Sequence, residues 1–113
     1  MAVREKRIGD VAIVKVRGIL TGGDETKEVQ ENVKRLLSDG IRKIVLDMSK
    51  VGWMNSHGMG MLMACYSSVR HVGGRIAISG VTDKVENVLK ITRIDTLFDQ
   101  FSSVDQAVSS FSG

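Results

Sequence analysis

The sequence predicts an α/β fold in which about four helices pack on a small mixed β-sheet of about four to five strands. Short apolar or alternating segments, typical of strands, recur between segments of helical periodicity. Glycine-containing turn signals separate these segments. The order strand, helix, strand, helix favours parallel strands joined by crossover helices, after an N-terminal hairpin. A length of 113 residues with 42% hydrophobic content suits a single domain, residues 1–113.

The first two strands are expected to form the hairpin. Residues 2–8 carry charge at nearly every other position and end at the turn dipeptide Gly9-Asp10, after which the β-branched segment 11–16 begins. The charges are typical of an edge strand, because they discourage pairing with another sheet edge. We expect the segment 18–23 to break the chain after this hairpin.

A first helix is expected next, with Asp24 as its N-cap and its end at Asp39-Gly40. Apolar residues at positions i, i+4, i+7 and i+8 would form its buried face: Val29, Val33, Leu36 and Leu37. The following segment, 43–48, contains a continuous apolar run. Such a run suits a central strand covered on both faces.

The segment 51–61 is the centre of the functional prediction. It is expected to leave the strand, turn, and open a helix from about Ser56 to Val72. A helix start has unpaired backbone N–H groups and the positive end of the helix dipole. Ser56 can therefore cap the helix or carry a phosphate there, and spacing alone favours the cap. One apolar stripe is expected along this helix: Met61, Leu62, Cys65, Val69 and Val72.

The C-terminal third predicts two more strands and two more helices. Residues 75–80 form the next strand, and Thr82 can cap the helix that follows. A short strand is expected around 98–101. Ser103 with Gln106 three residues later is a capping-box signature for the last helix.

Composition and spacing argue against several functions. The net charge of +3 is nearly balanced, and the basic residues are scattered in sequence, so no nucleic-acid partner is expected. The single cysteine excludes an internal disulfide and a cysteine-based zinc cluster. A charged N-terminus without an apolar core is not a signal peptide, and no apolar run approaches the ~20 residues of a membrane span. We therefore expect a cytoplasmic protein without membrane attachment.

No catalytic, cofactor or metal site is expected. Ser56 does not lie in a G-x-S-x-G elbow, and His57 is too close in sequence to act as its general base, which leaves a serine enzyme disfavoured. The glycines near it match no nucleotide fingerprint, and the aspartates show no metal-ligand spacing. Met59 and Met63 share a side of the helix that the main stripe does not need. Because methionine adapts to binding surfaces, this side is a candidate partner patch.

The chain resembles the STAS-domain anti-sigma factor antagonists over about residues 11–110. The markers are Gly18-Ile19-Leu20, Leu46-Asp47-Met48-Ser49-Lys50-Val51, Ser56-His57-Gly58-Met59-Gly60, Val69-Arg70-His71-Val72-Gly73-Gly74 and Ile91-Thr92-Arg93-Ile94-Asp95-Thr96-Leu97-Phe98. The resemblance implies a STAS-like sheet and helices without catalysis. It also implies that Ser56 is phosphorylated by an anti-sigma factor that is a GHKL-type serine kinase, and that a PP2C-type phosphatase resets it. The unphosphorylated antagonist would bind the kinase and free a bacterial sigma factor.

The resemblance also supplies an expected partner-binding set: Thr21, Asn55, Ser56, His57, Gly58, Met59 and Met63. The family usually has aspartate at the positions of Asn55 and Thr21 and a second serine at that of His57, so Ser56 is the only local phosphate acceptor here. We expect a monomer or weak homodimer. The alternative within the fold is a STAS docking subunit of a transporter, lipid-trafficking or stress-signalling assembly that is not switched by phosphate.

Overall fold

The structure, a computed structural model, describes residues 2–112 and contains one five-stranded sheet in the order β1-β2-β3-β4-β5. β1 pairs with β2 antiparallel, and the other three pairings are parallel, as the sequence predicts. In chain order the elements are β1 (Val3–Ile8), β2 (Val11–Leu20), α1 (Asp24–Ser38), β3 (Lys43–Met54), α2 (Ser56–His71), β4 (Arg75–Ser79), α3 (Asp83–Ile91), a short 3-10 turn (Ile94–Thr96), β5 (Asp99–Phe101) and α4 (Val104–Ser110).

The predicted break at residues 18–23 is wrong in its start, because β2 continues through Leu20. Gly18 has a φ of 102°, and the pairing with β3 shifts register around it. A glycine accommodates this bulge, and the strand then resumes. Burial explains the extension, since Leu20 and its partner Met54 are both fully buried.

For the same reason β3 is longer than expected. The sequence places a turn from Val51 onward, whereas the strand runs on to Met54 and a single residue, Asn55, joins it to α2. Val51 and Met54 are fully buried, and the exposed residues Gly52 and Trp53 lie between them in the strand. The functional segment is therefore a strand end and a helix start that meet almost directly.

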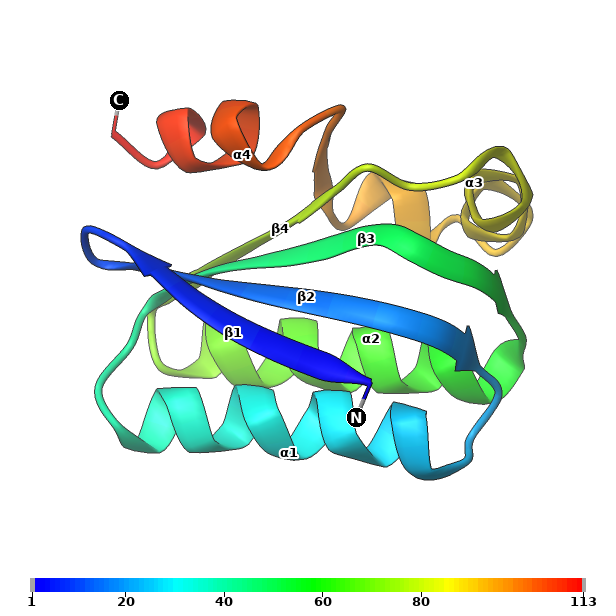
Figure 1. Ribbon diagram of the computed structural model, residues 1–113, viewed down its shortest axis with the longest axis horizontal. Helices are drawn as coiled ribbons and strands as arrows, with labels where there is room; N and C mark the ends of the chain where they lie inside the picture. The colour runs from blue at the N-terminus through cyan, green and yellow to red at the C-terminus, as the bar shows by residue number, and fades with distance from the viewer. Residues whose placement is uncertain (1, 113) are drawn as a thin grey trace.

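The two faces of the sheet are covered unequally. Figure 1 shows α1 and α2 side by side beneath the sheet and α4 above it. Most of the core lies on the α1–α2 side and includes Leu20, Leu46, Met54 and Leu62. A smaller cluster lies on the α4 side: Val11, Ile13, Val45, Ala77, Ala107 and Phe111.

The α4 side leaves part of the sheet uncovered. With seven residues α4 is about 10 Å long. The ten residues of β2 span about 33 Å. From Lys15 to Ile19 every residue of β2 except Val16 is accordingly exposed.

Of the predicted N-caps of α1, α3 and α4, two are confirmed and the one at Asp24 is wrong. Asp24 is not the N-cap of α1: Gly23 holds that position without a side-chain cap, and Asp24 lies in the first turn, where a carboxylate favours the helix dipole. The caps at Thr82 and Ser103 are confirmed, since their hydroxyls accept from Val85 N and Gln106 N.

Two smaller expectations need correction. The Gln106 side chain reaches Ser102, whose N–H and hydroxyl both donate to it, and so closes the capping box one residue earlier than the usual pattern. Val72 does not extend the α2 stripe, because the helix ends at His71 and Val72 is 40% exposed. The other four members of that stripe are buried.

Candidate functional site

The candidate site lies where β2 and β3 end and α2 begins. Ser56 is the first helical residue of α2, and Asn55 is the N-cap. The Asn55 Oδ1 accepts from His57 N at 2.9 Å and from Gly58 N at 3.3 Å. The prediction that Ser56 caps the helix is therefore wrong, because the neighbouring amide oxygen already accepts from the N–H groups that need a partner.

Ser56 is left free by this arrangement. Its side chain is exposed, and no hydrogen bond found among residues 2–112 uses its hydroxyl. The first turn of α2 contains no acidic residue, and the helix places Arg70 and His71 in its last turn. The positive end of the helix dipole thus faces Ser56 without a competing carboxylate on the helix itself.

Asn55 also joins the site to the end of β2. Its backbone N–H donates to Leu20 O at 3.2 Å, and its Nδ2 donates to Thr21 O at 3.4 Å. Two members of the predicted partner-binding set, Thr21 and Asn55, are therefore in contact, and Ser56 follows Asn55 directly. The contact with Thr21 uses its backbone carbonyl and does not depend on the identity of the threonine side chain.

Two glycines allow the close approach of α2 to the loop after β2. A Cβ on Gly58 would lie 2.2 Å from Leu20 O, and one on Gly22 would lie 2.9 Å from His57 Cβ. Gly58 is buried, so this predicted contact residue packs against its own chain. His57 is exposed beside Ser56.

The two methionines of the predicted patch differ in exposure. Met63 is 46% exposed, whereas Met59 is half-buried and packs against the main core. Farther along that side of α2, Tyr66 packs edge-on against Phe98 with ring centroids 5.4 Å apart. The open part of this side is therefore around Met63, between the half-buried Met59 and Tyr66.

Sequence reasoning missed an apolar pair at the edge of the site. Ile19 and Trp53 are register partners on β2 and β3 and are 49% and 44% exposed. Because Met54 and Leu20 point into the core, their neighbours must point to the opposite, uncovered face. Extending the strand alternation through Met54 would have found this pair.

The described residues also lack the features of other site types. Among residues 2–112 no group of three or more His, Cys, Asp or Glu side chains could hold a metal ion. None of the helices between these same limits combines the length and apolar character needed to cross a membrane. Cys65 is buried, and burial raises the pKa of its thiol to about 12.

The chain is similar in sequence and in structure to known proteins. The family model described as STAS domain matches residues 2–107. A candidate anti-sigma factor antagonist of Thermotoga neapolitana is 31% identical over 77 residues, which cover 68% of each chain. The crystal structure of a candidate anti-sigma factor antagonist from Thermotoga maritima matches with a TM-score of 0.88 and 25% identity, covering 96% of this chain and 92% of the other.

The fold also matches the anti-sigma factor antagonist SpoIIAA in two states. The unphosphorylated form gives a TM-score of 0.75 at 12% identity and covers 99% of both chains. The phosphorylated form, described as a Bacillus cell fate determinant, gives the same TM-score and identity over 97% of this chain and 99% of the other. At this identity the likeness concerns the fold alone.

Proposed function

Because this chain belongs to the STAS domain family, we propose that it is a cytoplasmic anti-sigma factor antagonist switched by phosphorylation of Ser56. In this proposal the chain has no catalytic activity of its own. Unphosphorylated, it binds a GHKL-type anti-sigma factor kinase as a monomer or weak homodimer and so frees a sigma factor. Phosphorylation by that kinase ends the interaction, and a PP2C-type phosphatase restores it.

The observation that carries the proposal is the free hydroxyl at the start of α2. A capping serine would be occupied by backbone N–H groups, whereas here Asn55 accepts from them and Ser56 is exposed. A kinase can reach such a hydroxyl without unfolding the helix. Asn55 thus performs the structural role and leaves the serine for modification.

Phosphorylation at this position is compatible with an unchanged domain. A phosphate adds about −1.5 to −2 charges, which takes the formal +3 of the chain to roughly +1. The positive end of the α2 dipole stabilises that charge locally.

If phosphorylation leaves the domain unchanged, the loss of partner binding must arise at the interface with the partner. A partner seated over Ser56 and the exposed His57 would bury the phosphate. An interfacial charge without a counter-ion costs about 2–5 kcal/mol. This cost weakens binding by about thirtyfold to several thousandfold.

Incubation with ATP, magnesium and the kinase-type anti-sigma factor encoded beside this chain tests the proposal. Intact mass should increase by one phosphate in the parent chain and remain constant in Ser56→Ala. The phosphorylated chain should then elute apart from the kinase in size-exclusion chromatography. Treatment with a PP2C-type phosphatase should restore both the original mass and the complex.

Other outcomes separate the alternatives. A stable complex without a mass increase would contradict the switch and favour a STAS docking subunit of another assembly. Ester hydrolysis that disappears in Ser56→Ala would instead indicate a serine enzyme. A mass increase that persists in Ser56→Ala would place the modification at another residue.

A further inference from the structure

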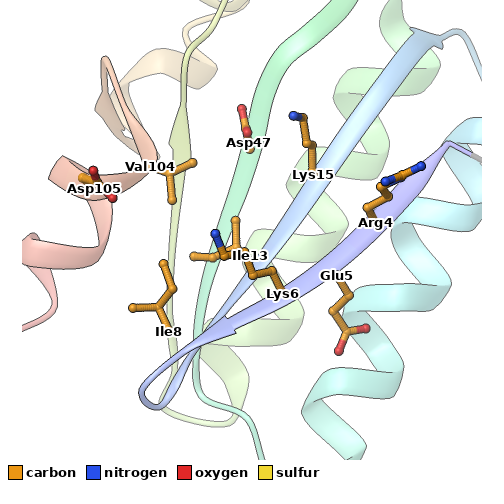
Figure 2. Close-up of a pocket in the computed structure, with 9 residues that line it drawn as sticks. All are labelled: Arg4, Glu5, Lys6, Ile8, Ile13, Lys15, Asp47, Val104 and Asp105. Carbon is orange, nitrogen blue, oxygen red and sulfur yellow. The ribbon is translucent and has the colours of Figure 1, made fainter.

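A second surface with a distinct chemistry lies on the uncovered face of the sheet. Five basic side chains from three neighbouring strands line it: Arg4, Lys6, Lys15, Arg17 and Lys50. They are scattered in sequence, and the pairing of β1, β2 and β3 gathers them. Figure 2 shows three of them, Arg4, Lys6 and Lys15, together with Asp47 on the neighbouring strand. We call these five residues the basic surface.

The basic surface is hollowed in two adjoining places. One cavity of about 210 Å³ is lined only by cations: Arg4, Lys15, Arg17 and Lys50. The second, of about 530 Å³, shares Arg4 and Lys15 with the first and has apolar residues, Ile8, Ile13 and Val104, among its lining. Together they form a groove with a cationic end and a partly apolar floor.

The charges of the basic surface are not neutralised by the described part of the chain. None of its five side chains makes an ion pair among residues 2–112. Glu5, which also borders the larger cavity, points away toward α1, where its carboxylate pairs with Arg35. Asp47 and Asp105 are the remaining acids of the lining.

The charge count shows how concentrated this surface is. The chain has 16 basic and 13 acidic residues. Five of the basic residues line the groove. Two acidic residues, Asp47 and Asp105, line it as well, when Glu5 is left out because it pairs with Arg35. The rest of the chain then carries 11 of each sign. The unpaired charged residues of the groove lining thus sum to +3, which makes the groove an electrostatic attractor for an anionic partner.

We propose that the basic surface binds an extended acidic polypeptide segment of a partner protein. Acidic side chains at alternate positions of an extended chain repeat at about 6.6 Å, because each residue rises about 3.3 Å. Arg4 and Lys6 stand at the same i, i+2 spacing on β1. Such a segment can therefore set several carboxylates opposite several cations at once.

The shape of the groove favours this occupant over other anions. A small ion fills only the cationic cavity and leaves Lys6 and the apolar floor without contacts. A flat anionic membrane cannot follow the hollow, and the phosphate backbone of a duplex offers no apolar group to Ile8, Ile13 and Val104. A polypeptide supplies both carboxylates and apolar side chains, as the lining requires.

The basic surface continues toward the end of the sheet where Ser56 lies. Arg17 and Lys50 are register partners, and the next pair but one along the two strands is the exposed Ile19 and Trp53. The inference nevertheless goes beyond the proposed function, because it requires neither phosphorylation nor a kinase. It is tested on the unmodified chain.

The direct test uses a fluorescein-labelled peptide of about ten residues with glutamate at alternate positions and alanine between, long enough to span the strands. Fluorescence anisotropy should show binding that weakens as salt is added. Lys15→Glu combined with Arg17→Glu should weaken it by about tenfold or more. Lys27→Glu combined with Lys34→Glu on exposed positions of α1 changes the net charge equally and should alter affinity by less than about twofold.

Two-dimensional NMR of the same titration locates the site. Backbone signals of β1, β2 and β3 around the basic surface should shift, while those of α1 should not. Equal loss of binding in both double variants, or shifts spread over the whole chain, would overturn the proposal. So would tighter binding of pyrophosphate, of phosphatidylglycerol vesicles or of duplex DNA than of the peptide.

Discussion

At the scale of single residues, the helix cap and the proposed phosphate acceptor are two different neighbours. Asn55 caps α2 and donates to the loop after β2, whereas the hydroxyl of Ser56 is exposed and makes no hydrogen bond within residues 2–112. Each residue can therefore be changed without removing the role of the other. This separation makes the proposed function open to test by substitution.

Ser56→Asp should weaken partner binding while leaving the fold intact. The new carboxylate lies at the first position of α2, where the helix dipole stabilises it by about 0.3–1 kcal/mol. Isothermal titration against the kinase should show at least about a tenfold loss of affinity. The midpoint of thermal unfolding should stay within a few degrees of that of the parent chain, and equal affinity of the two proteins would contradict the switch.

Asn55→Ala should destabilise the chain by about 1 kcal/mol, since it removes the acceptor for two N–H groups of α2. Urea unfolding measures this difference. Asn55→Asp retains a capping oxygen and serves as the matched control, with a smaller change. If Ser56→Ala proved as destabilising as Asn55→Ala, the assignment of the cap would be wrong.

At the scale of elements, two contacts hold the sheet against its helices. The end of β2 meets the first turn of α2 through the carbonyl of Leu20, which lies close to both Asn55 and Gly58. At the β1 edge of the sheet, the Glu5 carboxylate accepts from Arg35 and Asn32 of α1. The first contact depends on close backbone approach and is sensitive to an added side-chain atom. The second depends on charge and is sensitive to pH.

Gly58→Ala should destabilise the chain by about 3 kcal/mol, because the added Cβ would meet the fixed carbonyl of Leu20. Gly60, two residues later, has no atom within 4 Å of the place of a Cβ. Gly60→Ala should therefore stabilise the helix by about 0.5–1 kcal/mol. Chemical unfolding measures the change in the free energy of unfolding for each variant. The two changes should have opposite signs if this packing is right and the same sign if it is not.

Glu5→Gln should lower stability at neutral pH by about 0.5 kcal/mol. Burial raises the pKa of Glu5, but hydrogen bonds from Arg35, Asn32 and Arg7 and the charge of Arg35 together outweigh it and hold that pKa below its usual value. A lowered pKa in the folded state contributes stability above the unfolded pKa that is lost as pH falls through the folded one.

The difference between Glu5→Gln and the parent chain should therefore vanish as pH falls through the range in which Glu5 titrates. Urea unfolding at a series of pH values measures it. Glu31→Gln changes the same charge at an exposed position of α1 that makes no ion pair in the described part of the chain. A matching pH profile for Glu31→Gln would show that the effect is one of net charge and not of the β1–α1 contact.

At the scale of the whole molecule, the helices cover the two faces of the sheet unequally, and this determines which side chains are buried and which are exposed. Two long helices bury one face with most of the core, and the short α4 leaves part of the other face to solvent. Core residues are therefore shielded on the α1–α2 side, and charged residues gather on the open one. Cys65 belongs to the shielded side and reports on its integrity.

The Cys65 thiol should react with a disulfide reagent such as Ellman's reagent only when the chain unfolds. It is 2% exposed, and burial raises its pKa to about 12, so the nucleophilic thiolate is almost absent at pH 8. Labelling should be slow in buffer and fast in denaturant. Rapid labelling of the native chain would show that the contact between α2 and the sheet opens locally.

Much of the fold follows from local patterns. Strand and helix order, the N-terminal hairpin and the caps at Thr82 and Ser103 were predictable because each depends on residues near one another in sequence. The place of Ser56 at a helix start was also predictable, because the segment 51–61 follows an apolar strand and precedes a helical pattern. That the Ser56 hydroxyl is free of the cap could not be predicted, because this depends on whether Asn55 or Ser56 accepts hydrogen bonds from the first N–H groups of α2.

What the sequence alone determined was therefore the set of elements, their order and the one serine at the start of α2. The tertiary structure decided how far β2 and β3 extend, that Gly58 packs against Leu20, and that scattered basic residues form one surface. The physical reason is that burial and strand pairing join residues far apart in the chain. Local propensity carries no information about those contacts until the sheet brings its strands together.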